Sequence, residues 1–161
     1  MIVILMGVAG SGKTTVGQLL TKELGWKFYE GDNFHSQDNI NKMKQGCALT
    51  DADRDAWLAA LTNLIKELDK KKQSAVITCS ALKRAYRDRL TENSSKIQFV
   101  YLKGSYDLIQ HRIEARRDHY FKVDLLKSQF EILEEPGLAI VINVAQTPDM
   151  IVEQIKQALR F

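Results

Sequence analysis

The chain has 161 residues, of which 45% are hydrophobic and 27% charged, and its formal net charge is +3. These values are typical of a globular protein with one well-buried core, and they exclude a low-complexity chain. The apolar runs are only as long as strands, so we expect no membrane-spanning segment. The two cysteines, Cys47 and Cys79, form no disulfide framework, which favours a reducing, cytoplasmic location.

The positive charge does not form a nucleic-acid-binding pattern. The basic run Lys70–Lys72 stands at the predicted end of a helix, where lysines face water and favour the helix dipole. No aromatic residues interleave with a basic stripe. We therefore expect no nucleic-acid partner, and anionic small molecules are the expected ligands.

Strand-like apolar runs alternate with helical patterns along the chain. The predicted strands are 2–6, 27–30, 75–79, 97–102 and 140–144, and the predicted helices lie near 13–24, 51–70, 82–91, 105–115, 123–134 and 148–160. This alternation predicts one α/β domain over residues 1–161, with a parallel sheet and helices on both faces. Ligands bind such sheets beyond the carboxyl ends of the strands, so the residues after each strand are the functional candidates.

The first predicted strand leads directly into a glycine-rich loop. Residues 7–14 read Gly-Val-Ala-Gly-Ser-Gly-Lys-Thr, which fits the phosphate-binding P-loop pattern G-x-x-x-x-G-K-[ST]. Backbone N–H groups of such a loop point at phosphate oxygens, Lys13 reaches the β and γ phosphates, and Thr14 is placed to bind Mg²⁺. A plain glycine turn is the alternative interpretation, but the strand before the loop and the helix after it favour a nucleotide site.

Acidic and polar residues follow the second strand, in the order Glu30-Gly31-Asp32-Asn33-Phe34-His35. We predict that Asp32 accepts the proton of an attacking hydroxyl or holds that hydroxyl in line, and that it also serves Mg²⁺. An Asx turn is the alternative interpretation of Asp32. His35 is a weaker candidate when taken alone.

The helix predicted over 51–70 carries an arginine on its apolar stripe. Thr50 is its predicted cap, with Asp53 three residues later as in a capping box. Arg54 shares a face with the predicted core residue Trp57. An arginine on a buried face requires an anion or a carboxylate partner, and the sequence leaves open whether that partner is a ligand or a structural ion pair.

Three cations follow the third strand. Ser80 stands at the predicted helix start, and Lys83, Arg84 and Arg87 come directly after it. Positive charges at the N-terminus of a helix oppose its dipole, and a bound substrate carboxylate would resolve this conflict. A solvated basic face is the alternative interpretation.

Arginines also cluster after the helix that Ser105 is predicted to cap. Arg112 lies just before, and Arg116 and Arg117 lie at the start of, a segment that we predict to be a mobile lid, roughly residues 116–123. Arginines on such a lid close over ATP and neutralise charge on the moving phosphoryl group. Favourable C-terminal charge on the helix explains some of these arginines, but it does not require three. The predicted ATP-binding residues are Gly7, Val8, Ala9, Gly10, Ser11, Gly12, Lys13, Thr14, Thr15, Arg112 and Arg116.

Several segments in series resemble the gluconokinase family of small P-loop kinases. The matching segments are 6–14, 30–35, 39–43, 49–54 with Trp57-Leu58, 79–84 with Tyr86-Arg87-Asp88, 99–104, 128–131 and 133–136. The P-loop alone occurs in many families. The runs Asp-Asn-Phe-His at 32–35 and Cys-Ser-Ala-Leu-Lys at 79–83 are far more specific.

The resemblance implies a three-layer fold of the nucleoside-monophosphate-kinase type with a mobile lid, ATP and Mg²⁺ as reactants, and 6-phosphogluconate as the product. It also implies a cytoplasmic homodimer. Lys13, Asp32 and Arg116 are then the expected catalytic residues, and Thr14 and Asp32 the expected metal ligands. The implied gluconate contacts are Asp32, His35, Arg54, Ser80, Lys83, Arg84, Arg87 and Gln129.

The sequence departs from the family pattern at two places. Glu30 stands where the family usually has Asp, so we assign it no catalytic role, and the loop after 135–137 is short. Two other functions stay open. A kinase of another small hydroxy acid, such as shikimate, would usually carry Asp-x-Asp after strand two. A P-loop switch protein would hydrolyse nucleotide without an acceptor.

Overall fold

The computed structural model describes residues 1–116 and 123–161, which build a five-stranded parallel sheet in the order β2-β3-β1-β4-β5. The strands are β1 (Ile2–Met6), β2 (Lys27–Glu30), β3 (Ala75–Thr78), β4 (Ile97–Lys103) and β5 (Ile140–Asn143). The helices are α1 (Lys13–Leu24), α2 (Gln37–Lys44), α3 (Asp51–Lys70), α4 (Arg84–Thr91), α5 (Tyr106–Glu114), α6 (Val123–Ile132) and α7 (Pro148–Leu159), with a short 3₁₀ turn, η1 (Gly31–Phe34). The predicted α/β class and parallel sheet are confirmed.

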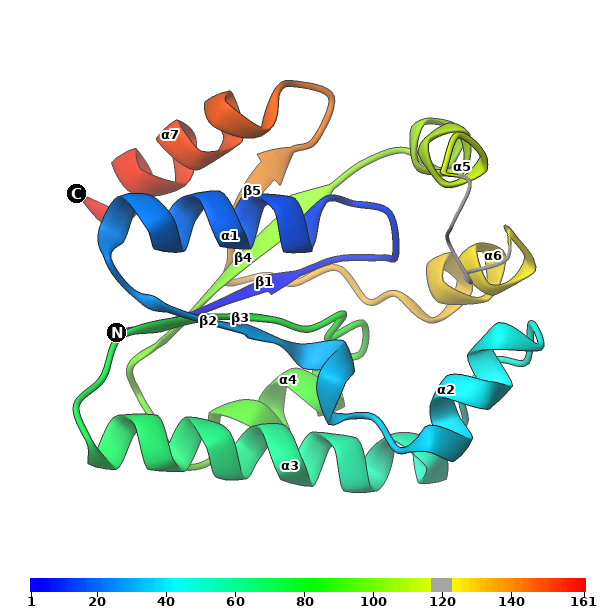
Figure 1. The fold of residues 1–161 in the computed structure, drawn as a ribbon, viewed down its shortest axis with the longest axis horizontal. Helices are drawn as coiled ribbons and strands as arrows, with labels where there is room; N and C mark the ends of the chain where they lie inside the picture. Colours follow the sequence, from blue (N-terminus) through cyan, green and yellow to red (C-terminus); the bar gives the residue numbers. More distant parts are fainter. Residues whose placement is uncertain (117–122) are drawn as a thin grey trace.

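The sheet is covered on both faces, which explains why β1 is apolar at every position. Successive side chains of a strand point to opposite faces. Val3 and Leu5 pack in one apolar cluster with residues of α1 and α7, whereas Ile2, Ile4 and Met6 pack in a second cluster with residues of α3 and α4. Figure 1 shows these helix pairs on opposite sides of the sheet, and α2, α5 and α6 beyond the carboxyl ends of the strands. The site is therefore framed by the strand ends and these three helices.

The starts of α3 and α5 follow the capping signals that the sequence predicts for them. The Thr50 hydroxyl accepts from the Asp53 N–H, and Asp53 completes the capping box. Ser105 and Thr147 accept from the N–H groups three residues later, at Leu108 and Met150. Local hydrogen bonds of this kind depend only on nearby residues.

The bounds of the strands and of every helix except α2, which falls outside the predicted helix ranges, agree with the prediction to within two residues. The largest difference in a helix start concerns α4, which begins at Arg84 rather than at 82. Ala81 is left-handed, with φ of 45°, and Lys83 is extended, so the backbone is not yet helical there. The prediction that Ser80 stands at the start of this helix is therefore wrong.

Two further expectations concern the rest of the chain. The predicted lid, roughly 116–123, lies almost wholly outside the described residues. Among the helices of the described ranges, none is long and apolar enough to cross a membrane.

Candidate active site

The P-loop joins the end of β1 to the start of α1. Gly7 is left-handed in φ (144°), and a Cβ there would meet the Leu102 carbonyl oxygen at 2.8 Å, so only glycine fits. Gly12 is the N-cap of α1 and offers no side chain to the first N–H groups of the helix. These N–H groups are therefore available to an anion, which the helix dipole also favours.

The Lys13 side chain folds back onto its own loop. Its Nζ donates to the carbonyl oxygens of Gly7 (3.0 Å) and Val8 (2.9 Å). Burial lowers the pKa of Lys13, while the nearby carboxylates of Asp32 and Glu30 act against that shift. The charged form of Lys13 is therefore disfavoured by its loss of hydration, and a bound phosphate would stabilise that charge.

Glu30 bridges the P-loop and the sheet. Its carboxylate accepts from the Thr14 hydroxyl at 2.5 Å and from the Thr78 hydroxyl at 2.5 Å. Because Thr14 uses its proton on Glu30, the lone pairs of its hydroxyl oxygen stay available to a cation. The sequence analysis assigned Glu30 no role. The one signal for this contact was its position at the end of β2, next to the P-loop.

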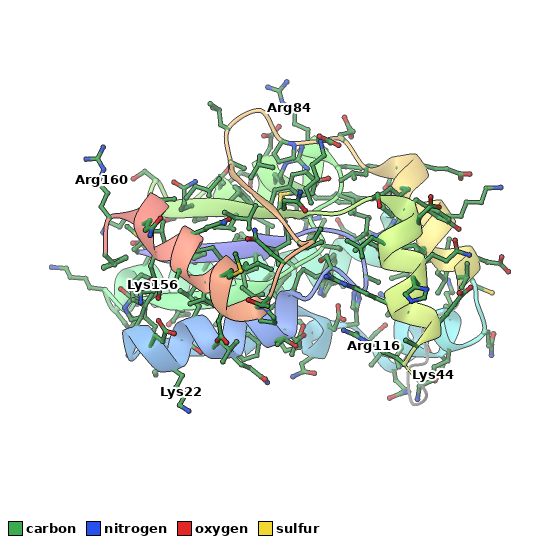
Figure 2. The ribbon with its side chains drawn as sticks, turned by 90° about the horizontal axis from the view of Figure 1, so that it is seen from above. Lys22, Lys44, Arg84, Arg116, Lys156 and Arg160 are labelled. Atoms are coloured by element: carbon green, nitrogen blue, oxygen red, sulfur yellow. The ribbon has the colours of Figure 1, made fainter. Side chains whose placement is uncertain are left out.

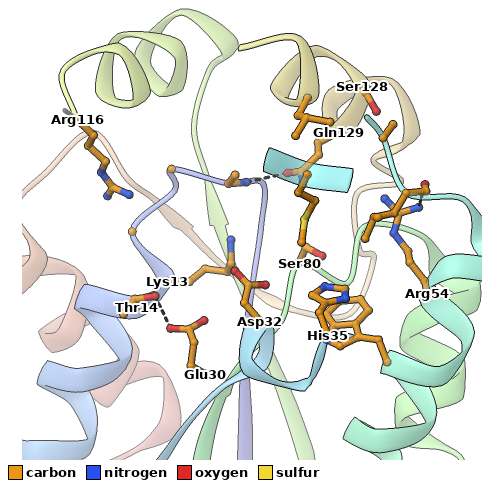
Figure 3. A pocket seen from close by; sticks show the side chains of 18 of the residues that line it. Lys13, Thr14, Glu30, Asp32, His35, Arg54, Ser80, Arg116, Ser128 and Gln129 are labelled. Carbon is orange, nitrogen blue, oxygen red and sulfur yellow. Dashed lines mark hydrogen bonds between the residues drawn. The ribbon is translucent and has the colours of Figure 1, made fainter. Parts of the chain in front are cut away.

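The η1 turn is fixed by its first residue. The Gly31 N–H donates to the Thr78 hydroxyl (3.0 Å), and its carbonyl accepts from the Trp57 indole N–H (2.8 Å). A Cβ on Gly31 would lie 1.9 Å from the Thr78 carbonyl oxygen, so no side chain is tolerated there. This anchoring holds Asp32 in the wall of the pocket, beside Lys13 (Figure 3).

His35 is held as a neutral ring beside Asp32. It stacks on Trp57 with a centroid distance of 4.2 Å and an interplanar angle of 16°. Its Nδ1 lies 3.4 Å from the Asn39 side-chain nitrogen. Burial, and secondarily the charge of Arg54, lowers the pKa of His35 to about 4. At neutral pH the ring therefore offers one donor and one acceptor instead of a positive charge.

Arg54 is buried on the other side of the same pocket, with 8% of its surface exposed. Its Nη1 donates to the Leu49 carbonyl (2.6 Å) and to the Tyr86 hydroxyl (3.3 Å). Among the described residues, no carboxylate forms an ion pair with Arg54. The structural ion pair that the sequence left open is therefore not seen there, and the remaining guanidinium donors face the pocket.

Helix α6 closes the pocket from above the P-loop. The Gln129 side-chain oxygen accepts from the Ala9 N–H at 2.8 Å, and Ser128 lies next to it at the pocket wall. The Ser80 carbonyl accepts from the Gly7 N–H at 3.3 Å, which ties the loop after β3 to the P-loop. Arg116 extends from the end of α5 toward the P-loop (Figure 3).

One pocket thus unites most of the predicted site residues. The predicted residues that line it are Ala9, Gly10, Gly12, Lys13, Thr14, Thr15, Asp32, His35, Arg54, Ser80, Arg116 and Gln129. Sequence reasoning missed several others, namely Glu30, Met43, Ala48, Leu49, Trp57, Leu125 and Ser128. The apolar members of this second group looked like ordinary core residues, because apolar spacing alone does not distinguish a pocket wall from a packed core.

Four predicted cations, Lys83, Arg84, Arg87 and Arg112, are not among the residues that line this pocket. Arg84 and Arg87 line a separate groove with the segment 134–138. Arg84 is largely exposed and points away from the side of the molecule that carries Arg116 (Figure 2). Arg87 is buried and donates to the backbone carbonyls of Ala81, Leu82 and Glu134. Arg112, which we expected to bind nucleotide, donates to the Val144 carbonyl at 2.6 Å.

Lys83 is also absent from the residues that line the pocket. Its Nζ pairs with the Asp51 carboxylate at 3.0 Å. The structure therefore does not bring the three cations after β3 together as one anion clamp. The cationic side chains that do face the pocket are Lys13, Arg54 and Arg116.

A phosphate-binding loop after the central strand of a parallel sheet, with a polar pocket beside it, is typical of P-loop nucleotide-binding proteins. The family model described as shikimate kinase matches residues 9–160. The thermoresistant gluconokinase of Escherichia coli K12 is 42% identical over 158 residues, which cover 98% of this chain and 86% of that protein. The chain belongs to the gluconokinase family, within the broader group that the shikimate kinase model describes.

Solved structures agree with this placement. A sugar kinase from Janibacter sp. HTCC2649 is 40% identical and superposes with a TM-score of 0.93, covering 99% of this chain and 94% of that one. A gluconokinase from Sinorhizobium meliloti 1021 is 38% identical, with a TM-score of 0.88, and the match covers 98% of this chain and 90% of that one. The family resemblance seen in the sequence is confirmed.

Proposed function

We propose that this chain transfers the γ-phosphoryl group of ATP to D-gluconate and forms 6-phospho-D-gluconate. The observation that carries this proposal is the open side of the Arg54 guanidinium, which faces the same pocket as the P-loop and Asp32. An acceptor for this site needs a carboxylate at one end and a hydroxyl within reach of the phosphate at the other. Relatives named gluconokinase, about 40% identical to this chain, support the same acceptor.

The phosphate side of the site stabilises the transferred group. The N–H groups at the start of α1 hold the phosphates, and Lys13 leaves the Gly7 and Val8 carbonyls to pair with them. Arg116 adds a second positive charge at the P-loop. These charges are needed most when negative charge spreads over the equatorial oxygens of the phosphoryl group in the transition state.

The acceptor side supplies the nucleophile. The terminal hydroxyl oxygen of gluconate bonds to the γ-phosphorus, the bond from that phosphorus to the β–γ bridging oxygen breaks, and ADP leaves. Asp32 holds the hydroxyl in line and takes its proton. His35, Ser80 and Gln129 face the intermediate hydroxyls, and Arg54 takes the carboxylate through its remaining donors.

Thr14 and Asp32 are the residues that fit a Mg²⁺ ion. The Thr14 hydroxyl already donates to Glu30, so its oxygen lone pairs are free to bind a metal. Mg²⁺ is bound in such sites by few protein ligands together with nucleotide phosphates, and it neutralises charge on those phosphates. We further propose, on the family resemblance, that the protein is a cytoplasmic homodimer.

The proposal assigns no gluconate contact to Lys83, Arg84 or Arg87. Arg84 and Arg87 line a different groove, and Lys83 is paired with Asp51 outside the pocket. The substrate carboxylate, which the sequence placed with these cations, is assigned to Arg54 instead. A direct contact from Arg87 would require its guanidinium to leave three backbone carbonyls.

The test is ADP release from MgATP with a panel of acceptors: D-gluconate, idonate, shikimate, nucleoside monophosphates and no acceptor. We expect turnover with gluconate. Shikimate is the second candidate, because the matching family model carries that name. Turnover with shikimate alone would overturn the gluconate assignment and keep the kinase, whereas ADP release without any acceptor would indicate a nucleotide switch.

A further inference from the structure

Tyr86 connects the pocket arginine to an ion pair outside the pocket. Its hydroxyl accepts from Arg54 Nη1 at 3.3 Å and donates to the Asp51 carboxylate. Asp51 in turn accepts from Lys83 Nζ at 3.0 Å. The four side chains, from α3 and from the segment around the start of α4, thus form a continuous chain of hydrogen bonds that ends at the pocket.

The direction of these hydrogen bonds is fixed by chemistry. The Asp51 carboxylate only accepts, and the guanidinium of Arg54 only donates. The Tyr86 hydroxyl must therefore give its proton to Asp51 and present a lone pair to Arg54. The hydrogen bond from Tyr86, and secondarily that from Lys83, lowers the pKa of Asp51, so Asp51 stays ionised and keeps the hydroxyl in this orientation.

The hydrogen bonds that Arg54 makes to the described residues occupy one nitrogen of its guanidinium group and leave the other nitrogens for a ligand. Both bonds that it makes to protein come from Nη1, to Leu49 and to Tyr86. Within the described ranges, the fully buried side-chain polar atom without a partner is Ser11 Oγ, so the other guanidinium nitrogens of Arg54 are not sealed in the core. They reach the pocket that Arg54 lines. The two hydrogen bonds from Nη1 therefore fix the plane of the guanidinium group, and with it the direction in which the other N–H donors meet a ligand.

Core packing explains the Tyr86 ring but not its hydroxyl. The residue is 6% exposed and packs with Trp57 and Leu90 in one apolar cluster. Arg54 and Lys83 both lie over its ring, at 5.6 and 5.7 Å from the centroid. Phenylalanine would satisfy all of these contacts. The hydroxyl adds only the link between Arg54 and Asp51.

We propose that Tyr86 is a positioning residue for the acceptor carboxylate, which it serves by orienting the Arg54 guanidinium, with Asp51 and Lys83 holding its hydroxyl in place. This inference rests on the proposed gluconate kinase function. It gives Lys83 a part in acceptor binding without any contact to the substrate. A planar guanidinium group binds a carboxylate through two parallel hydrogen bonds, so a small rotation of the guanidinium plane weakens both bonds.

The test is the steady-state kinetics of Tyr86→Phe, which keeps the ring and removes the link. We expect KM for gluconate to rise about three- to tenfold, the equivalent of one hydrogen bond. The values of kcat and of KM for MgATP should stay within about twofold, because no phosphate contact changes. Tyr101→Phe is the matched control, since Tyr101 is buried in the same cluster and does not contact Arg54; its gluconate KM should be unchanged.

A double-mutant cycle separates positioning from general loosening of the structure. In an Arg54→Gln background, Tyr86→Phe should have no further effect on gluconate KM, because the residue through which it acts is gone. Additive effects of the two substitutions would overturn the inference, as would an unchanged gluconate KM in Tyr86→Phe. Asp51→Asn should raise gluconate KM in the same direction as Tyr86→Phe, and an unchanged KM there would remove Asp51 from the link.

Two controls keep the result interpretable. Thermal unfolding of Tyr86→Phe shows whether the variant folds. A drop in kcat and in MgATP affinity, together with the drop in gluconate affinity, would contradict a positioning role. If the unmodified protein does not phosphorylate gluconate, the proposed function fails by itself. An active protein whose Tyr86→Phe variant is indistinguishable from it contradicts the inference alone.

Discussion

At the residue scale, burial controls which charges the site presents. Lys13 and Arg54 are positive and face the pocket without a carboxylate ion-pair partner in the described part of the chain. His35, by contrast, is kept neutral by burial and by the nearby Arg54. Charge in a site of this kind is unfavourable without a ligand and favourable with an anionic one. We therefore expect the site to favour ligands that bring negative charge to Lys13 and to Arg54.

The His35 environment predicts a pH-dependent stability. The pKa of His35 is about 4 in the folded protein and near 6.5 as its ordinary value, so between these values the unfolded chain binds a proton that the folded chain does not. The free energy of unfolding should therefore fall as the pH is lowered through this range, and the slope that His35 contributes should disappear above about pH 7.5. We expect His35→Asn to remove about 2 kcal/mol of this fall.

The measurement is urea unfolding at several pH values from 4 to 7.5, for the unmodified protein and for His35→Asn. His111→Gln is the matched control, because His111 is exposed on α5. Parallel curves for the unmodified protein and His35→Asn across this window would contradict the prediction.

At the element scale, the loop between β3 and α4 is held by α4 and by the segment after α6. Ala81 adopts a left-handed backbone conformation, which is unfavourable for any residue that has a Cβ atom. Arg87 donates to the Ala81 carbonyl at 2.7 Å and to the Glu134 carbonyl at 2.8 Å. The Glu134 N–H donates back to the Leu82 carbonyl at 2.8 Å. These bonds stabilise the loop in the form that brings Ser80 to the pocket.

Two arginines of α4 should therefore differ in their effect on stability. Arg87→Met removes the donors of a buried guanidinium and leaves backbone carbonyls unpaired, which we expect to lower the free energy of unfolding by about 2–3 kcal/mol. Arg84→Met is the matched control, because its side chain is 81% exposed, and it should change that free energy by about 0.5 kcal/mol or less.

The measurement is the free energy of unfolding of both variants in urea, compared at an unchanged m-value. Equal effects would show that the backbone contacts of Arg87 do not support the loop. A selective loss of gluconate affinity in Arg87→Met, with the free energy of unfolding unchanged, would instead favour the direct contact expected from the sequence.

At the scale of the whole molecule, the site is assembled from both sides of the sheet. Lys13 belongs to α1 on one face, and Arg54 belongs to α3 on the other (Figure 1). Each ligand should therefore stabilise the fold through its own half of the site. Binding of a ligand at about 100 times its Kd adds about 2.7 kcal/mol to the free energy of unfolding, which for a chain of this size corresponds to about 5–10 °C in Tm.

We predict that MgATP and gluconate, added separately, each raise Tm by such an amount. Lys13→Ala should lose the shift with MgATP, along with turnover, and keep the shift with gluconate. Arg54→Gln should show the reverse, because it removes the donors for the carboxylate. Loss of both shifts in either variant, measured by differential scanning fluorimetry, would contradict a site with two separable halves.

The elements themselves were largely predictable from the sequence because their signals are local. The Thr50–Asp53 capping box and the Ser105 cap lie within four residues of the backbone that they stabilise. The P-loop pattern at 7–14 carries its own backbone geometry, since its glycines take conformations that other residues disfavour. The error at the start of α4 arose because the left-handed Ala81 follows no such local rule.

The sequence by itself determined the parallel α/β fold, the phosphate-binding loop and the family, because these depend on short spacings and on runs of adjacent residues. Only the tertiary structure decided which of the buried cations faces the pocket. Arg54 and Arg87 are both buried arginines on amphipathic helices, yet one opens into the pocket and the other binds backbone carbonyls. That difference depends on remote partners such as Glu134, which lies 47 residues from Arg87 in the sequence, and chain folding alone brings such partners together.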